Sequence, residues 1–271
     1  MTTPLLDCHS HSAFSPDGHD SVSEMCARAI DMGITVYGLS DHCEIDRFQE
    51  QGYQDRLTHS WNAMLEQKTK LSGRGITLLA GVEIGQALTD FPLAQEISAR
   101  TPDFVLYSLH RTRGIDDFYL LDFEHEYASP ASRKALLDTY YTELLEMAQT
   151  GDYDILAHLS YPLRYISHLG ITLEAQADLL DEILRTLAQR GKALEINTSG
   201  LRQEGGFTMP DFDTVKRFRE LGGELLSIGS DAHTVPHLGI GLETAHQMAQ
   251  QAGFRYLTYF KGRTPKHLPI P

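Results

Sequence analysis

The sequence lacks most of the features that mark secreted or membrane proteins. Cysteine occurs only three times in 271 residues, as Cys8, Cys26 and Cys43, and the spacing suggests no pairing. Such a sparse, odd-numbered set argues against a disulfide framework and is typical of a reducing compartment. No apolar run approaches the roughly 18 residues that a membrane span needs, and the segment MTTPLLDCHSHS lacks the basic region and apolar core of a signal peptide. We therefore expect a cytoplasmic protein with no membrane partner.

Basic residues are also scarce relative to acidic ones. The chain has 23 Lys and Arg against 37 Asp and Glu, which gives a formal net charge of −14. A surface this acidic repels the phosphate backbone of nucleic acids, so we expect no nucleic-acid partner. It favours a substrate that carries positive charge. Hydrophobic residues make up 41 % of the chain and charged residues 22 %, which is typical of a globular protein.

Short apolar runs alternate with longer amphipathic stretches along the chain. The amphipathic stretches have helical spacing, and the capping-box pattern Ser21-Val22-Ser23-Glu24 predicts the start of one helix. Seven strand–helix units predict a parallel α/β barrel, for which about 250 residues is usual. We expect one catalytic domain over residues 1–271, with a last apolar run at 254–260 as an extra strand or an outer element. The apolar runs, which suit buried parallel strands, are 4–9, 34–39, 76–82, 104–109, 155–158, 193–196 and 225–228.

Ionisable residues stand at or just after the end of each predicted strand. Alternate residues of an extended segment share a face, so His9 and His11 can hold one ion together. The carboxyl ends of parallel barrel strands converge on one face, which is the catalytic face of such folds. A single His after a strand is more often a hydrogen-bonded loop residue, but this regular succession predicts a metal site. The other residues in the series are Asp41, His42, Glu83, His110, His158, Glu195, Asp231 and His233.

The residue types indicate which metals and which chemistry the site suits. Imidazole and carboxylate groups without a cysteine pair favour zinc, iron or manganese. Closely spaced divalent ions are a common device for hydrolysing phosphate esters. Arg164 and Arg202 each follow a predicted strand end by six or seven residues, which makes them candidates for binding phosphate. The alternative for each is a solvated loop arginine.

The ordered motifs resemble those of the PHP (polymerase and histidinol phosphatase) family. Within it, the chain looks most like the stand-alone histidinol phosphatases, on the strength of segments 161–164, 195–202 and 260–263. The resemblance implies a distorted seven-stranded parallel (β/α) barrel of TIM-barrel type that binds three divalent metal ions. The matching motifs are His9-Ser10-His11, Asp17-Gly18, Asp41-His42, Glu83, Ser108-Leu109-His110, His158 and Ser230-Asp231-Ala232-His233.

The resemblance also implies a role for each matching residue. The first metal would be held by His9, His11, Glu83 and Asp231; the second by Glu83, His110 and His158; and the third by Asp17, His42 and His233. A hydroxide between the first two metals would attack phosphorus, so Glu83, Asp231 and His233 are the expected catalytic residues. His233 is one candidate proton donor to the leaving group, and a metal-bound water is the other.

The implied activity is hydrolysis of L-histidinol phosphate to L-histidinol and phosphate in histidine biosynthesis, with a small phosphate ester as the substrate. Three alternatives stay open. The first is a PHP phosphoesterase that acts on nucleotides, single-stranded DNA ends or another small ester, which the net charge of −14 disfavours. The second is a metal-dependent amidohydrolase, but no lysine stands where such an enzyme would carboxylate one. The third is an inactive scaffold, which should have lost ligands.

Overall fold

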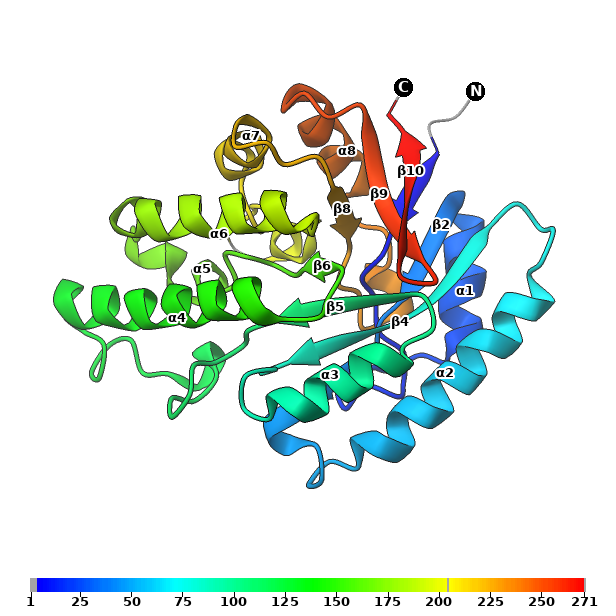
Figure 1. The fold of residues 1–271 in the computed structure, drawn as a ribbon, viewed down its shortest axis with the longest axis horizontal. Helices are drawn as coiled ribbons and strands as arrows, with labels where there is room; N and C mark the ends of the chain where they lie inside the picture. The colour runs from blue at the N-terminus through cyan, green and yellow to red at the C-terminus, as the bar shows by residue number, and fades with distance from the viewer. Residues whose placement is uncertain (1–3, 204, 271) are drawn as a thin grey trace.

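The chain forms a curved sheet of parallel strands with helices around its outside (Figure 1). The structure is a computed structural model that describes residues 4–203 and 205–270. Strands follow one another around the wall in the order β1-β2-β4-β5-β6-β7-β8, and each neighbouring pair is parallel. The predicted distorted seven-stranded parallel barrel is therefore confirmed.

The elements alternate along the chain as the sequence predicts. The strands of the barrel wall are β1 Leu5–Asp7, β2 Ile34–Leu39, β3 His42–Glu44, β4 Thr77–Gly85, β5 Phe104–Ser108, β6 Ile155–Leu156, β7 Ala193–Asn197 and β8 Leu226–Gly229. The helices are α1 Val22–Asp31, α2 Tyr53–Lys70, α3 Phe91–Arg100, α4 Pro130–Thr150, α5 Leu163–Ile166, α6 Ala177–Arg190, α7 Phe212–Glu220 and α8 Leu242–Gln251. Strand β3, which pairs with β4 beyond the end of β2, was not predicted because three residues give no periodic signal.

Hydrogen bonds between the first and last barrel strands bring the two ends of the wall together. The Cys8 N–H donates to the Ile228 carbonyl at 2.8 Å, and the Asp231 N–H donates to the His9 carbonyl at 2.7 Å. These bonds continue past the strand ends, where Ser10 and Ala232 form a parallel bridge. The closure therefore aligns the His-x-His segment near the N-terminus with the Asp231 segment more than two hundred residues later.

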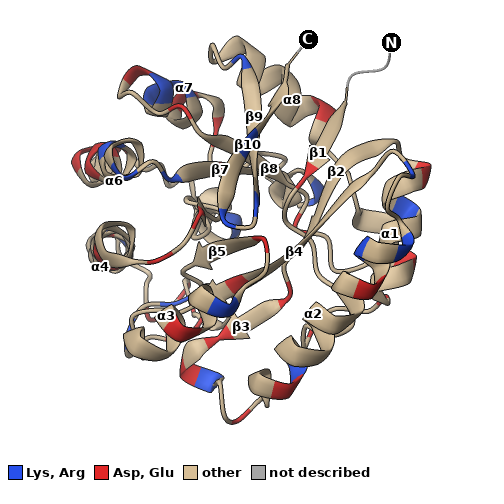
Figure 2. Ribbon diagram, turned by 45° about the vertical axis from the view of Figure 1, so that its right-hand side comes forward, with Lys and Arg blue, Asp and Glu red and all other residues tan. Residues whose placement is uncertain are grey.

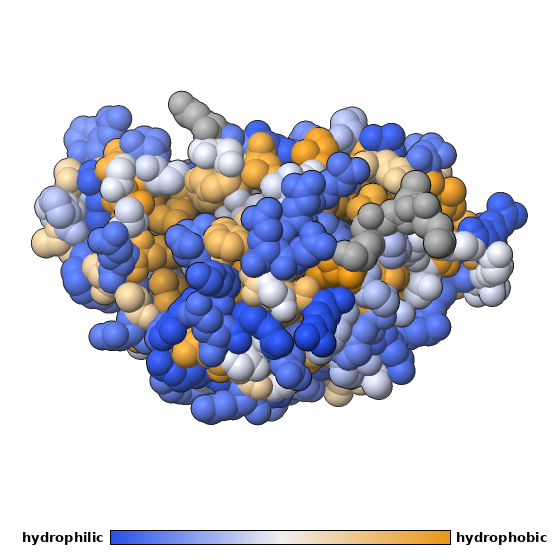
Figure 3. Space-filling model, turned by 90° about the horizontal axis from the view of Figure 1, so that it is seen from above, coloured by the Kyte–Doolittle hydropathy of each residue, from blue (hydrophilic) through white to orange (hydrophobic). Residues whose placement is uncertain are grey.

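The strands are buried on both faces, as expected for a parallel sheet whose interior is filled and whose exterior is covered by helices. All residues of β5, β7 and β8 are buried. Residues of both charge signs lie on outer helices such as α1, α6 and α7 (Figure 2). The face shown in Figure 3 is mostly hydrophilic, with scattered hydrophobic residues. No helix among the described residues combines the length and apolar character needed to cross a bilayer.

Local signals explain where several helices begin and end. The Ser21 hydroxyl accepts the Glu24 N–H at 3.3 Å while the Glu24 carboxylate accepts the Ser21 N–H at 2.9 Å, which confirms the predicted capping box before α1. Helix α6 ends at Gly191, whose φ of +62° lies in the left-handed region that glycine adopts readily.

The C-terminal segment forms an antiparallel hairpin of β9 Tyr256–Lys261 and β10 Thr264–Pro269, outside the barrel sheet. This resolves the open question about the run 254–260. The Arg263 N–H at the turn donates to the Asp103 carbonyl at 2.7 Å, and its guanidinium binds the buried Asp154 carboxylate. Because Asp103 and Asp154 precede β5 and β6, the hairpin turn lies against the N-terminal ends of these strands, away from the predicted catalytic face.

We predict that Arg263→Ala lowers the free energy of unfolding by about 3 kcal/mol, since it leaves the buried carboxylate of Asp154 without its cation. Denaturant unfolding would measure the change. Arg255→Ala, which removes an exposed arginine from the residue before β9, is the matched control and should change the stability little. Equal effects of the two substitutions would contradict the role of the ion pair.

Candidate metal centre and active site

The predicted metal ligands lie together at the carboxyl ends of the barrel strands. The first cluster is His9, His11 and Glu83, whose ligand atoms all lie within 4.8 Å of one another. Nε2 of His9 is 3.3 Å and Nε2 of His11 is 3.5 Å from Oε2 of Glu83. Oδ1 of Asp231 is 3.4 Å from His11 Nε2 and 3.8 Å from His9 Nε2. All four residues predicted for the first metal therefore surround one small space.

A second cluster lies on the other side of the Glu83 carboxylate. Its Oε1 is 3.4 Å from Nε2 of His110 and 3.0 Å from Nε2 of His158. The ligand atoms of Glu83, His110 and His158 also lie within 4.8 Å of one another. Glu83 therefore presents one oxygen to each cluster, which is the arrangement that a bridging carboxylate requires.

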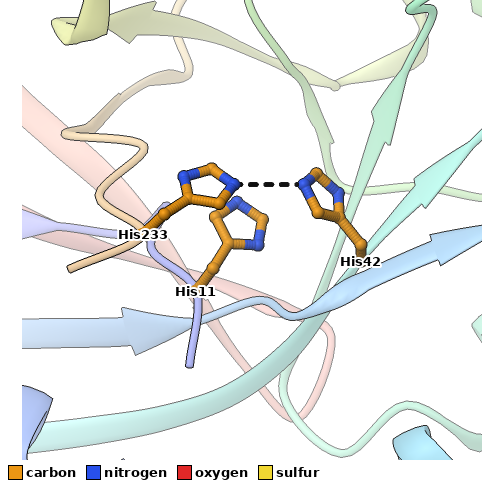
Figure 4. Close-up of side chains that lie close together, drawn as sticks. All are labelled: His11, His42 and His233. Carbon is orange, nitrogen blue, oxygen red and sulfur yellow. Dashed lines mark hydrogen bonds between the residues drawn. The ribbon is translucent and has the colours of Figure 1, made fainter. Parts of the chain in front are cut away.

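A third cluster is formed by His11, His42 and His233 (Figure 4). Nε2 of His42 and Nε2 of His233 are 3.2 Å apart, and the His11 ring is stacked on both rings, with centroids 4.1 Å away. Asp17 lies at the edge, with carboxylate oxygens 3.7 Å from His42 and 3.3 Å from His233. The family resemblance implied that Asp17 lies beside these two histidines, but it did not imply that His11 lies between two clusters.

Buried polar atoms with no hydrogen-bond partner test whether these residues fit metal ions. Within the described residues, Nε2 of His9 and Nε2 of His11 are buried and have no such partner, and Oε2 of Glu83 lies 3.3 and 3.5 Å from them. Leaving a buried polar atom unpaired costs free energy. Since these atoms face the same space and are metal-ligand types, the donor set fits divalent cations.

The charges at the centre offset one another. Burial opposes the charged form of His9, but the carboxylates of Glu195, Glu83 and Asp231 outweigh it and raise the pKa of His9 well above its usual value. Burial alone would raise the pKa of Glu83, yet His42 and His9 hold it well below the usual range. The Glu83 carboxylate is therefore ionised, as a metal ligand must be.

Two of the candidate ligands adopt backbone conformations that are unusual for residues other than glycine. His158 has a φ of +24° and Asp231 a φ of +51°. Such conformations cost of order 1–3 kcal/mol each and are concentrated at functional sites. Here they lie directly after β6 and β8, where the chain turns to bring both side chains toward the clusters.

Further carboxylates lie behind the histidines and orient their rings. Nδ1 of His110 is 3.0 Å from Oε1 of Glu44. The Ser15 hydroxyl is 3.2 Å from Nδ1 of His11 and donates to Asp41 at 2.8 Å. The ligand motifs do not reveal these contacts, although Asp41 stands at a predicted strand end.

The two candidate arginines lie near Asp231 but in different ways. Nη2 of Arg164 donates to Oδ2 of Asp231 at 3.2 Å and to the Ser199 hydroxyl. Arg202 donates to the backbone carbonyls of Ser230 at 2.7 Å and Asp231 at 3.1 Å. Arg164 lines the cavity described below, whereas Arg202 is not among its described lining residues. The geometry therefore favours Arg164 for phosphate, and the role of Arg202 stays a prediction.

A cavity of about 340 Å³ opens over the second and third clusters. Tyr161 forms part of its wall, with ring centroids 5.1 Å from His110 and 5.2 Å from His158, and its hydroxyl donates to Asp117 at 3.0 Å. Beyond the candidate ligands, the lining comprises Pro16, Glu44, Arg47, Gln51, Tyr53, Arg111, Asp117, Tyr119, Tyr161, Arg164 and Tyr165. The wall therefore carries both signs of charge.

Acidic and aromatic residues from several connections form part of this wall. Glu44, Tyr119 and Tyr161 line the cavity, whereas Asp122 binds the exposed His125 at 2.8 Å and is not among the described lining residues. Asp117 was missed because it lies in the long connection between β5 and α4, which has no periodic pattern.

Comparison with known proteins identifies the family. The PHP domain model matches residues 7–199. The chain belongs to the PHP domain family. A Thermotoga maritima relative named "Probable histidinol-phosphatase" is 30 % identical over 258 residues, which cover 93 % of this chain and 94 % of the relative. The Lactococcus lactis subsp. lactis histidinol-phosphatase is 28 % identical over 266 residues, which cover 95 % of this chain and 94 % of that one.

The fold of this PHP chain is also similar to a solved structure. The crystal structure of histidinol phosphate phosphatase from Lactococcus lactis, complexed with zinc, L-histidinol and phosphate, has a TM-score of 0.78 and 24 % sequence identity. The likeness covers 98 % of this chain and 100 % of that chain. Both proteins therefore share one architecture over their whole length.

We predict that Glu83→Gln reduces the metal bound at both the first and the second cluster, because one carboxylate faces both. Each lost charge-assisted contact should cost about 1.5–3 kcal/mol of metal binding. Elemental analysis after dialysis would measure the metal content. Glu143→Gln is the matched control, since Glu143 is also buried but binds Arg113 rather than a candidate ligand. Unchanged metal content in Glu83→Gln would exclude the bridging role.

Proposed function

We propose that this PHP chain is a metal-dependent phosphomonoesterase that hydrolyses L-histidinol phosphate to L-histidinol and phosphate. One observation carries the proposal: the Glu83 carboxylate faces two clusters of candidate ligand atoms beside a cavity that Arg164 also lines. The names of the relatives, at 28–30 % identity over nearly the full chain, supply the substrate.

The chemistry depends on divalent ions, and we propose three. Zinc, iron or manganese suit the His and carboxylate donors. His9, His11, Glu83 and Asp231 would hold the first, Glu83, His110 and His158 the second, and Asp17, His42 and His233 the third. Such ions supply hydroxide near neutral pH and neutralise charge that develops on the phosphoryl oxygens.

The residues of the chain itself would orient the ester. Arg164 would bind a phosphoryl oxygen through the N–H groups that it does not donate to Asp231 and Ser199, since a guanidinium has five. Its positive charge beside the metal clusters favours a dianionic phosphate group. His233 lines the cavity at the third cluster and lies where a leaving alkoxide could be protonated, either by its ring or by a water beside it.

The organic end of the substrate would lie against the aromatic and acidic wall. Tyr161 and Tyr165 offer ring faces and hydroxyls, and Asp117 offers a buried carboxylate to an ammonium or imidazole. Glu44 is less available because it already binds His110 and lies 3.6 Å from Arg111. We therefore infer that recognition depends on short-range hydrogen bonds and ring contacts more than on the net charge of the chain.

The main alternative is a PHP phosphoesterase for nucleotides or other small esters. A cavity of about 340 Å³ suits a small ester. Phosphate release from L-histidinol phosphate, measured beside sugar phosphates and nucleotides, distinguishes these functions. Cytoplasmic location and the absence of a nucleic-acid partner stay predictions.

We predict a kcat/KM for L-histidinol phosphate at least on the order of tenfold above that for glycerol phosphate. The metal and phosphate contacts are common to both esters and cancel, so the ratio reports contacts to the organic end, each worth about 1.5–3 kcal/mol if charge-assisted. Steady-state kinetics at low and high salt would measure the ratio, which should persist because the contacts lie inside a cavity. Equal kcat/KM values for the two esters would contradict the histidinol phosphate assignment and support only a general phosphoesterase activity.

We predict that Arg164→Ala raises KM for phosphate esters about tenfold or more, and weakens inhibition by inorganic phosphate to a similar degree, with metal content unchanged. The parallel variant Arg202→Ala tests the second arginine. A raised KM would assign Arg202 to phosphate binding. Unchanged KM with reduced metal content would assign it instead to holding the backbone of Ser230 and Asp231. Unchanged KM in Arg164→Ala would remove Arg164 from the phosphate site.

A further inference from the structure

Behind the candidate metal centre, one buried carboxylate joins two other segments of the barrel wall to its own strand. Glu195, on β7, is 1 % exposed and lies outside the ligand sets proposed above. Its Oε1 is 2.7 Å from Nδ1 of His9, which follows β1. Its Oε2 accepts the backbone N–H of His158 at 2.7 Å and the side-chain amide of Asn197 at 3.2 Å. One side chain therefore holds ligand-bearing segments that follow β1 and β6.

The contact with Glu195 determines which nitrogen of His9 carries the proton. A carboxylate only accepts hydrogen bonds, so Nδ1 of His9 must donate to it. The other ring nitrogen, Nε2, is then the one that can bind a cation once it has lost any proton of its own, and it lies 3.3 Å from Oε2 of Glu83 in the first cluster. Within the described residues, this Nε2 is buried and without a hydrogen-bond partner. The ring is therefore held in the tautomer that can bind a cation at the first cluster.

The shape of the neighbouring strand provides a second, independent observation. A Cβ atom added to Gly229, on β8, would lie 2.2 Å from Cβ of His9 and 2.3 Å from Oε1 of Glu195. Both distances are shorter than real Cβ contacts allow. Gly229 does not have a positive φ, so the requirement for glycine here is one of space and not of backbone conformation. The wall of the barrel is thus shaped around the pair of His9 and Glu195.

A similar arrangement supports the second cluster. Glu44 binds Nδ1 of His110 at 3.0 Å, and a Cβ atom on Gly85 would lie 2.2 Å from Oε1 of Glu44. Glu44 lines the cavity and lies near Arg111, so its substitution would alter the substrate site as well. Glu195 is outside the described cavity lining, so its substitution tests the support of a metal ligand without changing the substrate site.

We propose that Glu195 is a positioning residue that fixes His9 in the Nδ1–H tautomer and thereby sets the affinity of the first cluster for its metal ion. The inference rests on the proposed metal-dependent function and deepens it. Glu195 touches neither the substrate cavity nor the metal space, so it acts only through the His9 ring and through the segments that it joins.

Glu195→Gln is a sharp test because the amide has nearly the same shape as the carboxylate. The three donors around Glu195 cannot all be satisfied by one carbonyl oxygen. If that oxygen faces His158 and Asn197, the new NH₂ group faces Nδ1 of His9 and drives the proton to Nε2. If it faces His9 instead, the NH₂ group opposes two N–H donors. The first arrangement satisfies more donors, and it places a proton where the metal ion would bind.

We expect Glu195→Gln to weaken metal binding at one site by about 10–100-fold, the usual effect of losing a partner behind a metal-binding histidine. Titration of the metal-free protein with Zn²⁺ gives the stoichiometry and affinity. ¹⁵N NMR of the histidine rings, assigned through His9→Gln and followed to a pH at which His9 has lost its second ring proton, reports the tautomer of His9 in the metal-free protein. Neither measurement depends on catalysis or on the substrate. Glu143→Gln serves again as the buried control and should match the natural sequence in both measurements.

Glu195→Asp keeps the charge but shortens the side chain, so it should retain the Nδ1–H tautomer and bind metal with intermediate affinity. If Glu195→Gln fails to fold, this variant carries the test by the same two measurements. The inference is overturned if the variant tested keeps both its zinc affinity and its His9 tautomer unchanged. It is also overturned if Glu143→Gln loses as much zinc affinity as the Glu195 variant. Failure of the natural sequence to bind zinc would instead reject the proposed function.

Discussion

The Glu83 carboxylate lies within 3.5 Å of imidazole nitrogens from five histidines, namely His9, His11, His42, His110 and His158. The rings approach from four different strand ends, since His9 and His11 both follow β1, so these contacts are possible only when those strands are in register around β4. A buried carboxylate is stable only when positive charge or hydrogen bonds surround it. The requirement to compensate one buried charge therefore couples the fold of the whole wall to the chemistry at its centre.

Much of this centre was predictable because two rules act together. Residues two apart on an extended segment share a face, which placed His9 and His11 side by side, and parallel strands present their carboxyl ends to one face of a barrel. Given the strands, the convergence of Glu83, His110 and His158 needs no further information. The helix boundaries that were predicted correctly, such as the capping box at Ser21, depend on contacts only three residues apart.

What the sequence could not provide depends on contacts between distant segments without periodic signals. Strand β3 has three residues and is stabilised by pairing with β4, so no local sequence pattern predicts it. The position of His11 between two clusters follows from the closure of β1 against β8. Asp117 and Arg47 reach the cavity from irregular connections, whose paths are fixed by packing. Arg202 appeared equivalent to Arg164 by spacing alone, yet its hydrogen bonds go to backbone carbonyls rather than to side chains.

The same contacts explain how the barrel tolerates an unfavourable centre. Unpaired ligand atoms and the left-handed backbone at His158 and Asp231 both cost free energy before any cation binds. Each is held by bonds outside the cluster: the Asp231 N–H donates to the His9 carbonyl, and the His158 N–H donates to Glu195. The rigid backbone thus holds the candidate ligands in positions from which their side chains would otherwise move away. A cation that enters finds its ligands already oriented, so little of its binding free energy is spent on ordering them. The strained, preorganised ligands thus lower the free energy of unfolding but would raise the affinity for a metal ion. The carboxylates behind the rings determine the size of this gain in affinity.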